Sequence, residues 1–198
     1  SEYQTFYVTA GTGSIMELYR QIVTEMGIAR SSNSKAHMTY LIRKEIVELI
    51  EGKKMKVALI IDEASLLRLE VFVELHTICQ FEKDSKPYLP LILAGQANLV
   101  DKVMYRTSAP LASRIITRAH MEGLTREGMQ QYLLHHLNLA GIKKSLFEET
   151  AVTAIHQGSG GLLRKANNLA RGALMAASDQ KSMMVNAEHV RLAATEIF

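Results

Sequence analysis

Apolar residues in the first 120 positions alternate between strand-like runs and helix-like spacings. The run at residues 57–61 (Val-Ala-Leu-Ile-Ile) is apolar throughout, has the length of a strand and ends abruptly at Asp62 and Glu63. A run without alternation predicts a strand that is covered on both faces, as in a parallel sheet flanked by helices. Similar reasoning predicts strands at residues 6–10, 89–94 and 115–121, helices at 15–23, 37–50, 66–81 and 97–105, a helical turn at Pro110 and a polar linker at 30–34.

The pattern changes from Thr125 onward. Four helical stretches follow one another at residues 126–139, 148–157, 162–178 and 187–197, with no strand between them. We therefore predict a division near residue 123, with an α/β core over residues 1–123 and a helical bundle over residues 124–198.

Composition narrows the class of protein. With 198 residues, of which 47% are hydrophobic and 22% charged, the chain is long and apolar enough to bury a core. No apolar run approaches the roughly 20 residues of a membrane helix, and the N-terminal residues show no signal-peptide pattern. A single cysteine, Cys79, suits a reducing cytoplasm. The net charge of +3 permits an anionic partner such as nucleic acid without requiring one.

The strongest local signal for chemistry is the pair of adjacent carboxylates, Asp62 and Glu63, at the end of a buried strand. The carboxyl ends of parallel strands are where open α/β sheets bind ligands. In a phosphate-cleaving site the first carboxylate would hold Mg²⁺, commonly through water, and the second would polarise the attacking water. The alternative is a strand that simply ends in solvated acids.

Three further polar residues stand at the ends of predicted elements. Gln96 follows the strand at 89–94, where it would orient water or contact a γ-phosphate, or else cap the next helix. Arg114 leads into the strand predicted at 115–121, and Arg164 opens a helix after a Gly-Ser-Gly-Gly turn. Taken singly, arginines in such places are more often exposed charges.

The segment Gly11-Thr12-Gly13-Ser14 lies between a predicted strand and a predicted helix. A Walker A phosphate-binding loop needs a longer glycine-rich turn followed by Lys and Ser or Thr. Ile15 and Met16 stand where that pair would be sought, and no other segment matches the loop. We interpret residues 11–14 as a turn and a helix start.

Several short phrases together resemble one family. The chain is similar to the AAA+ ATPases of the ExeA (general secretion pathway protein A) and TniB-like transposition family. The matching phrases follow the family's order over nearly the whole chain: Ile-Ile-Asp-Glu-Ala at 60–64, Phe-Glu-Lys-Asp-Ser at 81–85, Leu-Ala-Gly-Gln at 93–96, Ser-Arg-Ile at 113–115, Gly-Leu-Thr-Arg-Glu at 123–127 and Gly-Gly-Leu-Leu-Arg-Lys-Ala-Asn-Asn-Leu at 160–169.

The resemblance implies a fold and a role for each matched residue. The fold is an α/β, P-loop NTPase-type core with a three-layer parallel sheet, followed by a helical lid. Asp62 corresponds to the Walker B carboxylate that holds Mg²⁺, Glu63 to the residue that activates water, and Gln96 to the sensor 1 polar group. Arg114 corresponds to the arginine finger that reaches a neighbouring subunit's ATP, and Arg164 to the sensor 2 arginine of the lid. ATP and Mg²⁺ are the implied cofactors, and an arginine that acts in trans implies a homo-oligomer.

The sequence also departs from the family's pattern. Ser65, Ala97 and Leu163 replace residues that are usual in the family, and the chain begins where the family's Walker A helix would have ended. We therefore expect negligible ATP hydrolysis and weak nucleotide binding from these residues on their own. Without the Walker A strand, the strands at 89–94 and 115–121 would present open edges, which predicts self-association, strand exchange or a rearranged sheet.

Three functions remain open from the sequence. The first is an ATP-dependent, oligomeric DNA-binding regulator that serves a transposase, as in the TniB-like branch. The second is the cytoplasmic ATPase part of a secretion-assembly protein, as in the ExeA branch, with a transmembrane helix and a periplasmic domain following Phe198. The third is a non-catalytic interaction module that binds a partner through residues 125–198.

Overall fold

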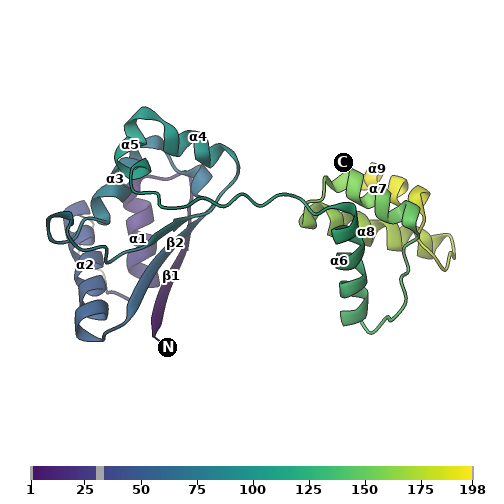
Figure 1. Cartoon of the computed structure of the whole chain (residues 1–198), viewed down its shortest axis with the longest axis horizontal. Helices are drawn as coiled ribbons and strands as arrows, with labels where there is room; N and C mark the ends of the chain where they lie inside the picture. Colours follow the sequence, from purple (N-terminus) through teal and green to yellow (C-terminus); the bar gives the residue numbers. More distant parts are fainter. Residues whose placement is uncertain (1, 30–33, 198) are drawn as a thin grey trace. The chain divides into compact units, whose positions relative to one another are not determined.

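The computed structural model describes residues 2–29 and 34–197. The chain forms two compact units, residues 1–118 and residues 119–198 (Figure 1). Most of the linker predicted at 30–34 lies outside the described residues.

The first unit has the alternating strands and helices that the periodicity predicts. The strands are β1 (Tyr3–Thr9), β2 (Lys56–Asp62) and β3 (Leu91–Leu93). The helices are α1 (Ile15–Glu25), α2 (Lys35–Val47) with the π-helical turn η1 (Glu48–Gly52), α3 (Leu69–Ile78), α4 (Asn98–Met104) and α5 (Ala109–Ala112), with 3₁₀ turns η2 (Ala64–Leu66), η3 (Glu82–Asp84) and η4 (Arg106–Ser108).

The three strands form a parallel sheet in the order β1-β2-β3, so β2 lies in the middle. One face is buried against α1, α2 and α3 through residues such as Phe6, Val8 and Leu59. On the opposite face Tyr7 is 49% exposed and Ile92 is 50% exposed. Because strand side chains alternate, Ile60 points to this second face and is only half-buried. In the described residues β2 is therefore covered less completely on this face than on the first.

The strand predicted at residues 115–121 is wrong. These residues have no regular structure, and Ile116 and Met121 are 99% and 92% exposed. The free edge of β3 does not pair with this segment, because the described ladders join only β1 with β2 and β2 with β3. Without a ladder partner the segment does not form a strand. The self-association expected from open edges stays a prediction.

The second unit consists of helices. They are α6 (Arg126–Leu139), α7 (Glu149–Ser159), α8 (Leu163–Asp179) and α9 (Ala187–Ile197), close to the four predicted stretches. The buried face of α8 is mostly alanine, including Ala166, Ala170 and Ala173. Such small side chains let α8 pack closely against α7 and α9. None of the helices in the described part of the chain is both long and apolar enough to cross a membrane.

A buried histidine fixes the start of α9. His189 is 2% exposed, and its Nδ1 accepts a hydrogen bond from the Asn186 backbone N–H at 3.1 Å. Its Nε2 must then carry the proton and donate to Gln180 Oε1, also at 3.1 Å. The Asn186 side chain accepts from the backbone N–H groups of Glu188 and His189. The neutral imidazole thus ties the end of α8 to the first turn of α9.

Replacing His189 with leucine should destabilise the second unit. The substitution keeps most of the buried volume but leaves the Asn186 backbone N–H without its acceptor, which costs about 1–3 kcal/mol of unfolding free energy. Urea unfolding, with amide hydrogen exchange of α8 and α9, measures the loss. His135→Leu, at an exposed position of α6, is the control and should change stability little. Equal stabilities of the two variants would contradict this account.

Candidate functional site

The carboxyl edge of the sheet brings together the acids predicted from the sequence. Asp62 is the last residue of β2, and Glu63 follows with φ 51° and ψ 29°, a left-handed conformation that non-glycine residues rarely adopt. The Ala64 N–H donates to Ala94 O at 2.8 Å, and the Ala94 N–H donates to Ile61 O at 2.9 Å. The chain that leaves β2 is therefore hydrogen-bonded to the chain that leaves β3. Left-handed non-glycine residues of this kind cluster at functional sites.

Close packing joins the two loops at this edge. A Cβ built on Gly95 would lie 2.8 Å from the Ser65 backbone nitrogen and 3.2 Å from its Cβ. Lys102 Nζ, on α4, donates to Ser65 O at 2.7 Å and to Leu67 O at 2.9 Å. Gln96 follows Gly95 directly and is exposed. The structure therefore gathers Asp62, Glu63 and Gln96 at one edge, as predicted for parallel strands.

Asp62 is held as an ionised carboxylate. The Tyr7 hydroxyl donates to its Oδ2 at 2.5 Å, and the Glu63 backbone N–H donates to its Oδ1 at 2.8 Å. These two hydrogen bonds, the one from Tyr7 first, lower the pKa of Asp62 below its usual value. The carboxylate is therefore charged at neutral pH.

This edge suits a magnesium ion that shares its ligands with phosphates. Mg²⁺ is usually bound by one or two carboxylates together with waters and substrate phosphates. Asp62 supplies one ionised oxygen ligand at this edge, which fits an Mg²⁺ ion whose other ligands are waters and phosphates.

Arg114 lies elsewhere in the same unit. Its guanidinium forms an ion pair with Asp84, and its Nε donates to His76 Nδ1 at 3.3 Å. Asp84 ends η3, in which Glu82, Lys83 and Asp84 have φ values of 42°, 56° and 73°. Three consecutive non-glycine residues in the left-handed region form a strained turn. This turn presents Asp84 to Arg114.

The surroundings of Arg114 have clear electrostatic consequences. The hydrogen bond from Arg114 lowers the pKa of Asp84, while burial, followed by the charge of Arg114, lowers the pKa of His76. His76 Nδ1 also lies 3.2 Å from Pro110 O. Because Nδ1 accepts the hydrogen bond from Arg114, it has no proton to donate to the Pro110 carbonyl oxygen. Within one chain Arg114 thus contacts Asp84 and His76 rather than Asp62 or Glu63.

Arg164 belongs to the second unit. It is the second residue of α8 and is exposed. The turn before it contains Gly160 and Gly161 with φ values of 59° and 76°, a conformation that glycine adopts without strain. The turn and helix start agree with the sequence, and the sensor role of Arg164 stays a prediction.

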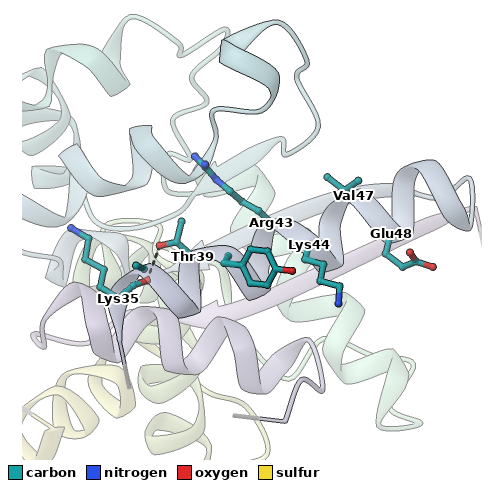
Figure 2. Close-up of a pocket in the computed structure, with 8 residues that line it drawn as sticks. Lys35, Thr39, Arg43, Lys44, Val47 and Glu48 are labelled. Carbon is teal, nitrogen blue, oxygen red and sulfur yellow. Dashed lines mark hydrogen bonds between the residues drawn. The ribbon is translucent and has the colours of Figure 1, made fainter. Parts of the chain in front are cut away.

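A shallow depression along α2 lies outside this site. Its volume is about 830 Å³, and residues of α2 and the following turn line it, among them Lys35, Tyr40 and Lys44 (Figure 2). Lys35 is already paired with Glu74 of α3. None of the predicted site residues lines the depression. We therefore assign no ligand to it.

Sequence reasoning missed three residues that contact the predicted ones: Tyr7, which donates to Asp62, and Asp84 and His76, which contact Arg114. In the observed register Thr9 lies opposite Asp62, and Tyr7 comes two residues before Thr9. Aligning the carboxyl ends of the two predicted strands would have given the same register. Asp84 belongs to a phrase that matches the family, but nothing in its sequence signals a left-handed turn.

Comparison with known proteins identifies the family. The model of a family described as "AAA domain" matches residues 1–103. The chain belongs to this family. Its α/β fold, with a parallel three-stranded sheet, is that of the P-loop AAA+ ATPases.

Individual relatives agree with this assignment. The chain is 31% identical over 157 residues to general secretion pathway protein A of Aeromonas hydrophila, covering 79% of this chain and 28% of that protein. The structure of Cdc6p from Pyrobaculum aerophilum matches with a TM-score of 0.73 and 15% identity over 100% of this chain and 54% of that one. The RuvB Holliday junction branch migration motor of Thermotoga maritima matches with a TM-score of 0.53 and 18% identity over 97% and 61%. This AAA domain chain thus spans about a quarter to three-fifths of these relatives.

Replacing Gly95 with alanine should disturb the carboxyl edge. The new methyl would meet backbone atoms of Ser65, so the two loops must separate, at about 1–3 kcal/mol of unfolding free energy. Urea unfolding and hydrogen exchange of residues 62–67 measure the change. Gly11→Ala is the matched control, because its nearest contact is at 3.8 Å. A Gly95→Ala variant as stable as the control would rule out the close packing.

Proposed function

We propose that this AAA domain contributes the magnesium-binding and water-activating residues to the ATP-hydrolysing site of a protein of the general secretion pathway protein A type. The observation that carries the proposal is the ionised Asp62 beside Glu63 at the carboxyl edge of a parallel sheet, with Gln96 on the adjoining loop. The 31% identity to the Aeromonas hydrophila protein supports this type.

Each residue at the edge has a task that its chemistry suits. Asp62 would hold Mg²⁺, which when bound neutralises the charge on the phosphates of ATP. Glu63 would orient and polarise the attacking water, and the left-handed backbone at this residue would fix where its carboxylate leaves the strand. Gln96 would orient the same water or donate to the γ-phosphate.

Two arginines that do not belong to the carboxyl edge would complete the ATP site. Arg114 would act in trans on the ATP of a neighbouring copy, because a planar, permanently charged group stabilises charge that spreads over the γ-phosphate. Its contacts within the chain, which are with Asp84 and His76 rather than with Asp62 or Glu63, support a role in trans. We assign residues 1–123 to the nucleotide-binding core and residues 124–198 to the lid, from which Arg164 would approach the nucleotide as sensor 2.

The proposal is tested by mixing two inactive variants of the natural protein, including any sequence outside residues 1–198. Glu63→Gln should lower ATP turnover by about 100-fold or more, and Arg114→Ala by on the order of 1,000-fold. An equal mixture should regain about a quarter of wild-type activity, because half the sites keep Glu63 and half the neighbours keep Arg114.

Asp84→Asn is the control for this experiment. It breaks the same ion pair within the chain but keeps Arg114, so a purely structural role of the pair predicts equal losses in Asp84→Asn and Arg114→Ala. Mixtures that stay inactive would reject the role in trans. Full activity of Glu63→Gln would reject the ATPase itself.

The second candidate function is a DNA-binding regulator that serves a transposase. It is favoured by the net charge of +3 and by a fold match to the Aeropyrum pernix ORC1 protein in complex with DNA, at a TM-score of 0.67 and 16% identity over 98% of this chain and 50% of that one.

DNA binding separates the two candidates. A regulator of this kind should bind duplex DNA only with ATP, and its affinity should fall steeply between about 50 and 200 mM salt as counterions are released. Fluorescence anisotropy of the natural protein with labelled duplex DNA measures this directly. No binding at the lowest salt leaves the secretion type as the function.

A further inference from the structure

The Tyr7 hydroxyl contacts the carboxylate of Asp62, the residue proposed to hold Mg²⁺. Tyr7 is on β1, on the open face of the sheet, and donates its hydroxyl proton to Asp62 Oδ2 at 2.5 Å. The other carboxylate oxygen, Oδ1, accepts the Glu63 backbone N–H at 2.8 Å. Both oxygens of Asp62 are thereby held, and each still has a lone pair for a further donor.

The strand register accounts for this contact. Tyr7 is the direct partner of Ile60 on β2, and Thr9 is the partner of Asp62. Tyr7 and Asp62 therefore point to the same face, two positions apart along the strands. A phenol is long enough to bridge this diagonal. The backbone pairing of β1 with β2 thus determines where the Tyr7 hydroxyl lies.

We propose that Tyr7 is a positioning residue, which holds the carboxylate of Asp62 in the orientation that receives a nucleotide-bound Mg²⁺ through its water shell. This inference rests on the proposed function of Asp62. Tyr7 would act through Asp62 and not on the nucleotide or metal directly. Its hydroxyl stops rotation of the carboxylate, so that the free lone pairs keep one direction.

The charges around the pair agree with this arrangement. The bond from Tyr7 is the largest cause that lowers the pKa of Asp62, and the same bond raises the pKa of Tyr7. The charge of Glu63 also raises the pKa of Tyr7, while the Thr9 side chain lowers it. These directions agree with the geometry, in which the Tyr7 hydroxyl donates and the Asp62 carboxylate accepts.

The test is Tyr7→Phe in the natural protein, including any sequence outside residues 1–198. ATP turnover is measured as a function of Mg²⁺ concentration. Loss of a hydrogen bond that orients a metal ligand should raise the Mg²⁺ concentration for half-maximal turnover by about tenfold. Turnover at saturating Mg²⁺ should fall much less. Tyr3→Phe is the matched control, because Tyr3 is on the same exposed face of β1 but its hydroxyl accepts from Lys56 Nζ at 3.2 Å.

Nucleotide binding supplies a readout other than turnover. The affinity for a non-hydrolysable ATP analogue is measured as a function of Mg²⁺ concentration. The Mg²⁺ concentration for half-maximal binding should rise about tenfold in Tyr7→Phe and should stay unchanged in Tyr3→Phe. Unchanged Mg²⁺ dependence of both turnover and binding in Tyr7→Phe would overturn the inference.

Asp62→Asn separates this inference from the proposed function. If Asp62→Asn leaves ATP turnover intact, the proposed function fails and the positioning role fails with it. If Asp62→Asn abolishes turnover while Tyr7→Phe behaves like Tyr3→Phe, only the positioning role fails. Circular dichroism of each variant verifies that the fold is retained.

Discussion

Backbone pairing in register between three parallel strands is the constraint on which the candidate site depends. It aligns the carboxyl ends of β1, β2 and β3, so the loops that follow Asp62 and Ala94 meet and exchange hydrogen bonds. It also sets Tyr7 diagonally opposite Asp62. A shift of one residue between β1 and β2 would turn Tyr7 to the buried face and remove its contact with Asp62.

Local patterns predicted most elements because local energetics decide them. The four helices of the second unit were predicted to within about two residues. The differences came from surroundings that the sequence does not reveal. Residues 115–121 have the composition of a strand but no paired neighbour, and Ile60 lies on the face that is covered less completely in the described residues. Strand formation and burial both depend on partners distant in sequence.

The sequence predicted only the site residues that stand at the end of a single strand. Asp62 and Glu63 follow directly from a buried run that ends in two acids. The contacts that determine how these residues behave are non-local, since the Tyr7 hydroxyl and Asp84 reach their partners across 55 and 30 residues. The close approach of Ser65 to Gly95 could not be predicted either, because it depends on two loops that are distant in sequence.

The left-handed turn at Glu82–Asp84 has a consequence for how firmly Arg114 is held. Each non-glycine residue in this region stores about 1 kcal/mol or more of backbone strain. The turn is closed by its own hydrogen bonds, from the Ser85 backbone N–H and hydroxyl to Glu82 O and from the same N–H to Phe81 O. These local contacts hold the strained residues, so the backbone that carries Asp84 is fixed independently of the ion pair with Arg114.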